Sequence, residues 1–294
     1  MHAFDLPQRE SNVKIILSRK GFDSGSGGCA SPVLPDGRML SLPIPDLRGG
    51  CRYGEIGDGT LGRIAEDLSG GRVRATSRAH LDPDLDPSAR PRTTGWKGCL
   101  GQTGSASSHL ASAGVGPGDV FLFFGWFRHV AQGNGGRWEF GSGDRGVHAI
   151  FGWLQVAEVL DLSLGSPAAW TRHPWLAGHP HLNRGAERGN TVFVASEELV
   201  LPGGRTGLSG YGVVPRLEKR NTLTSPGLSR SYWLLPDWFA PSDGSPALSY
   251  HSDPARWSST PDGTVLRTVG RGQEFVLDCE RRPQAAEWIT SLLS

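Results

Sequence analysis

Short apolar runs alternate with clusters of glycine, proline and polar residues along most of the chain. Runs of β-branched and aromatic residues bounded in this way are typical of buried strands. We expect strands at 15–17, 120–127, 147–160, 190–196 and 265–277, and a hairpin over 33–44 that turns at Pro35-Asp36-Gly37. Apolar or small residues at helical spacing predict short helices over 61–68, 102–113 and 284–293.

These elements predict a β-rich α+β fold. Its centre would be a mixed or antiparallel sheet, or a partly open barrel of the PUA type, with a few short helices and long loops. The 42 glycines and 21 prolines of the 294 residues favour such a turn-rich architecture. We expect one domain over 13–294 with a barrel-like core at 116–200, and a frayed start at 1–12.

The composition says more about the expected cellular location of the protein than about its function. The net charge of +1 gives no overall basic bias toward nucleic acid. The four cysteines form no CxxC pair, so neither a zinc ribbon nor a disulfide framework is suggested. The first residues lack the pattern of a signal peptide, and no apolar run approaches the ~18 residues of a membrane span. We expect a cytoplasmic protein that has no membrane partner.

A polar loop follows the first predicted strand and is the first candidate for a binding site. Arg19 and Lys20 offer cations that could hold a phosphate. Asp23 could act as an acid–base group or contact a ribose, and Ser24 could add a ligand contact. The glycines that follow would let the backbone approach a ligand closely. A solvated loop would have the same pattern.

The segment His80-Leu81-Asp82-Pro83-Asp84-Leu85-Asp86 concentrates charge at alternate positions. An extended backbone, which its prolines favour, would place His80, Asp82, Asp84 and Asp86 on one side. We assign His80 and Asp82 as acid–base candidates and Asp84 as a ligand contact. Hard cations such as calcium are bound by six or more oxygen ligands, and the segment lacks a calcium-loop pattern. We therefore assign no metal to it. A plain acidic turn is the alternative.

A histidine-rich stretch over 173–181 is the densest group of titratable residues in the chain. His179 and His181 flank Pro180 and would point to the same side of an extended segment. Imidazoles here could carry protons near neutral pH, contact a phosphate or base, or hold a transition metal. No ligand pair on a regular element supports the metal, so we assign both residues to catalysis.

Two stretches in the middle of the chain resemble a known type of barrel. GDVFLFFGWFR and the later IFGWLQVAEV are similar to the core strands of small PUA, ASCH and EVE barrels, which are linked to binding RNA or modified bases. The resemblance implies a base pocket lined by aromatic residues. Trp126, Arg128 and Trp153 are its candidate residues.

A wider resemblance covers residues 16–196. In chain order the segments ILSRKGFDS, SPVLPDGRMLSLPIPD, HLDPDL, GDVFLFFGWFR, IFGWLQVAEV, HPH and NTVFVAS resemble the bacterial and phage nucleotide modification associated domain 3 family. The resemblance implies a role linked to base or nucleotide modification, without a catalytic residue set to carry over. The chain lacks GxGxxG, Walker A, HExxH and GxSxG motifs, which disfavours common dehydrogenases, P-loop NTPases, zincins and α/β-hydrolases.

Two hypotheses follow from these observations. The preferred one is an enzyme that acts on a nucleotide or base, with Arg19 and Lys20 on the phosphate and the aspartates and histidines moving protons. The alternative is a non-catalytic reader that holds a modified base between aromatic side chains. The expected partner is a nucleotide or nucleic acid, with DNA favoured. The sequence assigns no cofactor, reaction or oligomeric state.

Overall fold

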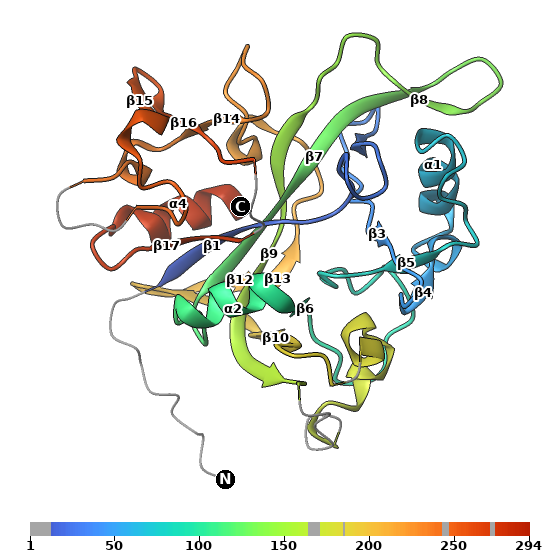
Figure 1. The fold of residues 1–294 in the computed structure, drawn as a ribbon, viewed down its shortest axis with the longest axis horizontal. Helices are drawn as coiled ribbons and strands as arrows, with labels where there is room; N and C mark the ends of the chain where they lie inside the picture. Colours follow the sequence, from blue (N-terminus) through green and yellow to red (C-terminus); the bar gives the residue numbers. More distant parts are fainter. Residues whose placement is uncertain (1–12, 164–170, 185, 243–246, 271–273) are drawn as a thin grey trace.

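A large mixed β-sheet organises the protein (Figure 1). The computed structural model describes residues 13–163, 171–184, 186–242, 247–270 and 274–294, and the start expected to be frayed, residues 1–12, lies outside them. Within the described residues the sheet has nine strands, which are β1 (Lys14–Arg19), β2 (Ser31–Val33), β6 (Cys99–Gln102), β7 (Val120–Gln132), β8 (Trp138–Phe140), β9 (Val147–Asp161), β10 (Thr191–Ala195), β13 (Tyr211–Val213) and β17 (Glu274–Asp278).

Smaller elements surround this sheet. Three small sheets contain β3 (Ile44–Pro45), β4 (Cys51–Arg52) and β5 (Arg78–His80), then β11 (Glu198–Leu201) and β12 (Gly204–Ser209), and then β14 (Tyr232–Leu235), β15 (Trp257–Thr260) and β16 (Gly263–Arg267). The helices are α1 (Thr60–Leu68), α2 (Gly104–Ser112) and α4 (Gln284–Leu293), with 3₁₀ turns η1 (Tyr53–Glu55), η2 (Pro174–Gly178), η3 (Pro180–Arg184), η4 (Lys219–Asn221), η5 (Asp237–Phe239) and η6 (Pro254–Arg256). None of the described helices has the length and apolar character needed to cross a membrane.

The β-rich α+β fold is confirmed, and so are the three expected helices to within two residues. The strands expected at 120–127 and 147–160 are β7 and β9, which pair antiparallel. Two expectations need correction. The hairpin over 33–44 is reduced to one antiparallel bridge between Val33 and Met39, and the Met39 backbone N–H donates outward to Pro215. The run 265–277 divides into β16 and β17, which belong to different sheets.

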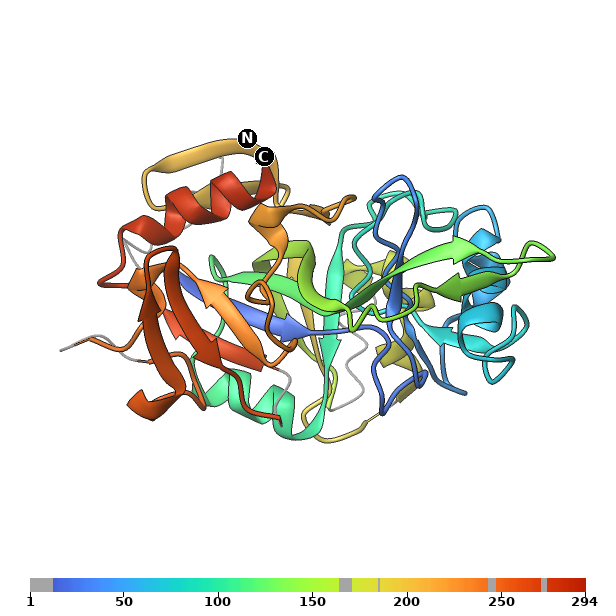
Figure 2. The same cartoon turned by 90° about the horizontal axis from the view of Figure 1, so that it is seen from above.

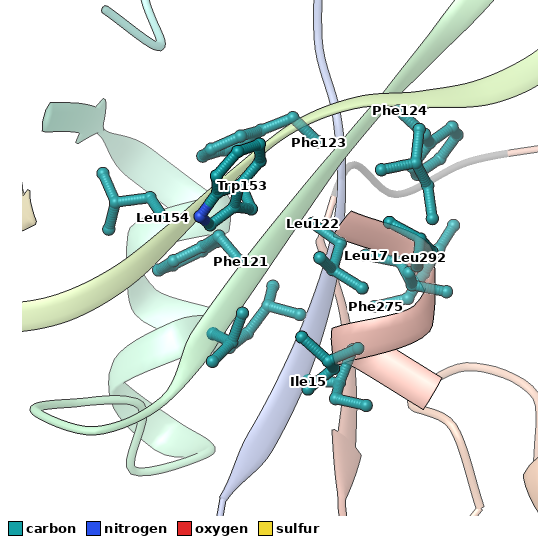
Figure 3. Packing of buried hydrophobic residues seen from close by; sticks show 14 of the residues in the cluster. Ile15, Leu17, Phe121, Leu122, Phe123, Phe124, Trp153, Leu154, Phe275 and Leu292 are labelled. Atoms are coloured by element: carbon teal, nitrogen blue, oxygen red, sulfur yellow. The ribbon is translucent and has the colours of Figure 1, made fainter. Parts of the chain in front are cut away.

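The core explains why β1 is apolar throughout its middle. β1 pairs antiparallel with β17 on one edge and parallel with β7 on the other. Helices α4 and α2 cover opposite faces of the sheet (Figure 2). Leu292 of α4 packs beside Leu17 of β1, and Phe121 and Phe123 of β7 belong to the same buried cluster (Figure 3). A strand that is covered on both faces has no position for a polar residue to face water.

The sheet is not closed into a barrel, and the barrel-like core expected at 116–200 stays a prediction. Its strand order runs β17-β1-β7-β9-β10-β6, and among the described residues no backbone ladder joins β6 to β17. These end strands nevertheless meet through side chains. Gln102, the last residue of β6, donates its amide to Glu274, the first residue of β17, and Lys20 Nζ lies 3.0 Å from the same carboxylate oxygen. Buried polar groups thus hold the two ends of the curled sheet together.

The pair of Lys20 and Glu274 is the first feature to test. Burial raises the pKa of Glu274, against the effect of the Lys20 charge. We predict that Lys20→Met lowers the free energy of unfolding by about 3 kcal/mol, because it leaves a buried carboxylate without its cation. Adding Glu274→Gln should restore most of this loss. Urea denaturation of both single variants and the double variant measures the coupling, and a Lys20→Met protein as stable as the wild type would contradict it.

Candidate functional site

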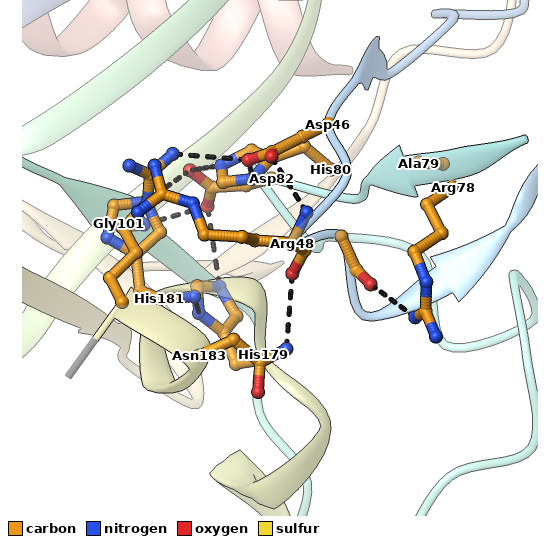
Figure 4. A network of polar contacts seen from close by, with 12 residues as sticks. Asp46, Arg48, Arg78, Ala79, His80, Asp82, Gly101, His179, His181 and Asn183 are labelled. Atoms are coloured by element: carbon orange, nitrogen blue, oxygen red, sulfur yellow. Dashed lines mark hydrogen bonds and ion pairs between the residues drawn. The ribbon is translucent and has the colours of Figure 1, made fainter.

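A buried carboxylate, Asp82, lies where three segments of the chain meet (Figure 4). His80 ends β5 just before it, while His179 and His181 reach it from the turns η2 and η3. The backbone N–H of Gly101 in β6 donates to Asp82 Oδ1 at 2.7 Å. Four of the five residues predicted to be catalytic therefore come together, although they are up to a hundred positions apart in the chain.

The three imidazoles surround the carboxylate at similar distances. His179 Nε2 lies 3.4 Å from Asp82 Oδ1, while His181 Nε2 and His80 Nε2 lie 3.5 Å and 3.6 Å from Asp82 Oδ2. The side chains of all four residues are at most 7% exposed. The distances exceed the ~2.7–2.9 Å of a charge-assisted hydrogen bond. The groups thus face one another across a small space.

Local structure fixes each histidine. His80 is held in the short sheet because β5 pairs with β3, with Ile44 opposite His80. Pro174 and Pro180 are the first residues of the 3₁₀ turns η2 and η3, a position where the N–H that proline lacks has no partner in the turn. His179 directly follows the last residue of η2, and His181 is the second residue of η3. The two prolines therefore help to form the turns that position His179 and His181.

A second set of polar residues orients two of the imidazoles. Asn190, just before β10, accepts at Oδ1 from His181 Nδ1 at 2.8 Å, and its Nδ2 donates to the His181 carbonyl at 2.9 Å. Asp46 lies with Oδ2 3.2 Å from His80 Nδ1, and Arg184 lies 3.3 Å from the same oxygen. Both rings are thereby directed at Asp82 through Nε2.

The environment keeps Asp82 ionised despite its burial. Burial alone would raise the pKa of Asp82, but the neighbouring imidazoles of His179, His181 and His80 outweigh burial and hold the pKa well below its usual range. Within the described residues, His80, Asp82 and His181 also form a group whose ligand atoms lie within 4.8 Å of one another, which is compact enough for a metal ion.

A pocket of about 250 Å³ lies against the segment that carries Asp82. Its wall is largely apolar and includes Leu40, Leu61, Leu81, Leu85, Phe151 and Val214. Asp82 belongs to this wall and to the histidine cluster at once. The N-terminal stretch predicted to form half of the site does contribute here, through Gly21 and the residues from Arg38 to Ser41.

Comparison with known proteins identifies the family. The model of the nucleotide modification associated domain 3 family matches residues 14–278. The chain belongs to this family. No curated protein and no solved structure shows significant similarity to the chain. The family resemblance found in the sequence is thus confirmed over nearly the whole chain, and it includes all of the Asp82 cluster.

In this family member the acidic residues after Asp82 have other partners. Asp84 is buried and forms two hydrogen bonds of 2.7 Å with Arg92. Asp86 accepts at Oδ1 from the backbone and hydroxyl of Ser88. The four charged residues therefore do not share one partner, and the expectation that they lie on one side of the segment stays a prediction. The strand ends at His80, and beyond it Asp84 pairs through its backbone with Cys99.

The polar loop after β1 does not reach the cluster through any described contact. Lys20 pairs with Glu274, and Asp23 Oδ1 accepts from the backbone of Gly25 and Ser26 in a local turn. Ser24 is exposed. Arg19 lies near His148, whose pKa falls to about 3 through burial and through the nearby charge of Arg19. Phosphate binding by Arg19 and Lys20 and an acid–base role for Asp23 stay predictions.

The aromatic candidates lie apart from one another. The register of β7 and β9 places His148 opposite Trp126 and Leu122 opposite Trp153, so the tryptophans are separated by four positions, roughly 13 Å, along the strands. Trp153 is buried and donates its indole N–H to Ser209. Arg128 lies over the ring of Phe140. The register therefore does not place the two tryptophans side by side, and a base pocket between them stays a prediction.

Sequence reasoning missed four residues that build the site. Asp46, Arg184 and Asn190 are common surface residue types, and Asp46 and Asn190 lay at the ends of segments noted only for their strands and family resemblance. Gly101 gave no signal because one glycine among many is unremarkable. In the structure, a side chain on Gly101 would overlap the imidazole of His181. Its hydrogen atom leaves the room that this ring needs.

Gly101→Ala tests whether that space positions His181. We predict that the new methyl group displaces the imidazole and lowers the free energy of unfolding by about 1–3 kcal/mol, as overpacking does. Urea denaturation gives the stability, and histidine NMR signals report the ring environment. Gly116→Ala is the matched control, since a Cβ there meets nothing within 4 Å. Equal stability and unchanged histidine signals in both variants would refute the role of Gly101.

Proposed function

We propose that the protein is an enzyme that modifies a nucleotide or a nucleic-acid base, with DNA as the favoured nucleic acid. The Asp82 cluster would be the reaction centre, and the adjoining pocket would hold the base. Membership of the family supports the link to nucleotide modification. The observation that carries the rest is that Asp82 belongs both to the pocket wall and to the cluster of three histidines.

The pocket suits one flat, mostly apolar group. Its volume of about 250 Å³ is below the ~300–1,000 Å³ of typical ligand pockets, which fits a single base or nucleoside better than an oligonucleotide. Leucine and phenylalanine side chains can cover the faces of a ring. Arg38 also lines the pocket and is about half exposed, so its guanidinium could meet a phosphate outside. A base inside and a phosphate at the mouth match the shape of a nucleotide.

The cluster suits chemistry better than simple binding. A reader needs shape and hydrogen bonds at the base edge, whereas this site gathers an ionised carboxylate and three imidazoles beside the pocket. Buried titratable groups with partners from several segments are a common property of reaction centres. The alternative of a reader would use the pocket and leave this cluster without a role in function.

An assay of conversion tests the proposal. Purified protein is incubated with a panel of nucleotides and short DNA and RNA oligonucleotides, and the products are followed by mass spectrometry. We predict a mass change in at least one substrate class with the wild type, and its loss with Asp82→Asn. His129→Ala is the control, because His129 also faces an aspartate, Asp144 at 3.4 Å, but is 67% exposed. Circular dichroism confirms that the compared variants are folded.

A second pair of variants tests the pocket. Val213 lines the pocket and is 41% exposed, so Val213→Trp should obstruct it with little effect on the core. Val200→Trp places the same side chain at another exposed strand position. We expect Val213→Trp alone to abolish ligand binding and conversion. Binding by the wild type without conversion of any substrate would favour the reader, and full conversion by folded Asp82→Asn would refute the assigned centre.

A further inference from the structure

The hydrogen bonds of Asn190 fix which nitrogen of His181 carries a hydrogen. Asn190 Nδ2 donates to the His181 carbonyl, so Asn190 Oδ1 is the atom that faces His181 Nδ1 at 2.8 Å. An amide oxygen only accepts, and the hydrogen must therefore be on Nδ1. In a neutral imidazole this leaves a lone pair on Nε2. That lone pair faces the Asp82 carboxylate at 3.5 Å.

His80 has the same orientation. Its Nδ1 lies 3.2 Å from the Asp46 carboxylate, and a hydrogen on Nδ1, on the side of Asp46, leaves the lone pair of Nε2 free to bind a cation beside Asp82. Arg184 holds Asp46 in place from the other side. The His80 ring is turned away from ideal alignment, and among the described residues its Nδ1 has no properly aligned hydrogen-bond partner. His80 Nε2 then faces Asp82 Oδ2 at 3.6 Å.

With the hydrogens of both rings on Nδ1, three electron-rich atoms converge in a buried space. Two imidazole lone pairs and a carboxylate oxygen repel one another unless a cation lies between them. Bonds of ~2.0–2.2 Å from a tetrahedral metal ion place its ligand atoms about 3.3–3.6 Å apart. The separations of 3.5 Å and 3.6 Å match this spacing, whereas hydrogen bonds of charged groups are ~2.7–2.9 Å long.

We propose that His80, Asp82 and His181 bind one divalent transition-metal ion through Nε2, Oδ2 and Nε2. Imidazole ligands favour zinc, iron, cobalt or nickel over magnesium and calcium, which prefer oxygen. The backbone N–H of Gly101 holds the second carboxylate oxygen, Oδ1, and His179 Nε2 lies 3.4 Å from the same oxygen. The inference deepens the proposed function, on which the catalytic meaning of the ion rests, but ion binding can be measured without any substrate.

Charge and outer contacts support the site. Asp82 and Asp46 carry two negative charges and Arg184 one positive charge, so a dication enters a region with a net charge of its opposite sign. A histidine ligand of a metal usually donates its other N–H to a carboxylate or carbonyl oxygen. The Asp46 carboxylate lies beside Nδ1 of His80, and the Asn190 amide oxygen lies beside Nδ1 of His181. Two bonds from histidine and one from a carboxylate also leave coordination positions open for water or substrate.

Cobalt binding tests the proposal directly. Tag-free protein is stripped with a chelator, dialysed and titrated with Co²⁺, whose visible absorption reports nitrogen ligands, and with Zn²⁺ by calorimetry. We expect one ion per chain. His181→Gln, His80→Gln and Asp82→Asn should each weaken binding more than about 100-fold, and Asn190→Ala about 10–100-fold, as loss of an outer contact does. His129→Gln should stay within threefold of the wild type.

The outcomes separate this inference from the proposed function. A folded wild type without a cobalt spectrum, or folded His80→Gln, His181→Gln and Asn190→Ala variants that all bind normally, would overturn the metal site. Asn190→Ala removes no ligand, so it keeps the test valid should a ligand variant not fold. Ion binding without conversion of any nucleotide would uphold the site and reject the enzyme. Nucleotide conversion by a protein that binds neither Co²⁺ nor Zn²⁺ would uphold the enzyme and reject the metal site.

Discussion

The Asp82 carboxylate is ionised inside the protein, and the surrounding structure supplies what that requires. A charge removed from water needs close partners, because its desolvation costs several kcal/mol. Here the partners come from β6 and from the two 3₁₀ turns, besides His80 at the end of β5. These segments are distant in the chain. Each must be in place for the others to have a partner, which links the site to the fold as a whole.

The large sheet sets the positions of these partners through its register. β6 pairs with β10 so that Gly101 lies opposite Val192 and Gln102 opposite Thr191. Asn190, which orients His181, directly precedes this ladder, and Gly101 both donates to Asp82 and leaves room for His181. A shift of the β6–β10 register by one residue would turn each side chain of β6 to the opposite face of the sheet. It would also move Gly101 away from Asp82 and Asn190. Strand pairing therefore decides the geometry of the site as much as the histidines do.

The residues of the cluster could be found in the sequence because they are polar and dense in loops between apolar strands. Their geometry could not be found. Alternation predicted a common side for Asp82 and Asp84, but it could not predict their partners, which are three histidines for Asp82 and Arg92 for Asp84. Lys20 seemed available to a phosphate because its partner, Glu274, lies 254 positions away. Helices were predictable since their pattern is local, whereas ion pairs between distant segments leave no local pattern.

The spacing around Asp82 also bears on the kind of chemistry. A proton on one imidazole would draw that ring to about 2.8 Å from the carboxylate and leave the other lone pair facing an anion. The two rings instead lie nearly equidistant from the same oxygen, at 3.5 Å and 3.6 Å. One cation shared by both rings accounts for this symmetry, and a single proton does not. The spacing therefore supports the proposal that His80 and His181, first assigned to proton transfer, hold an ion beside the pocket.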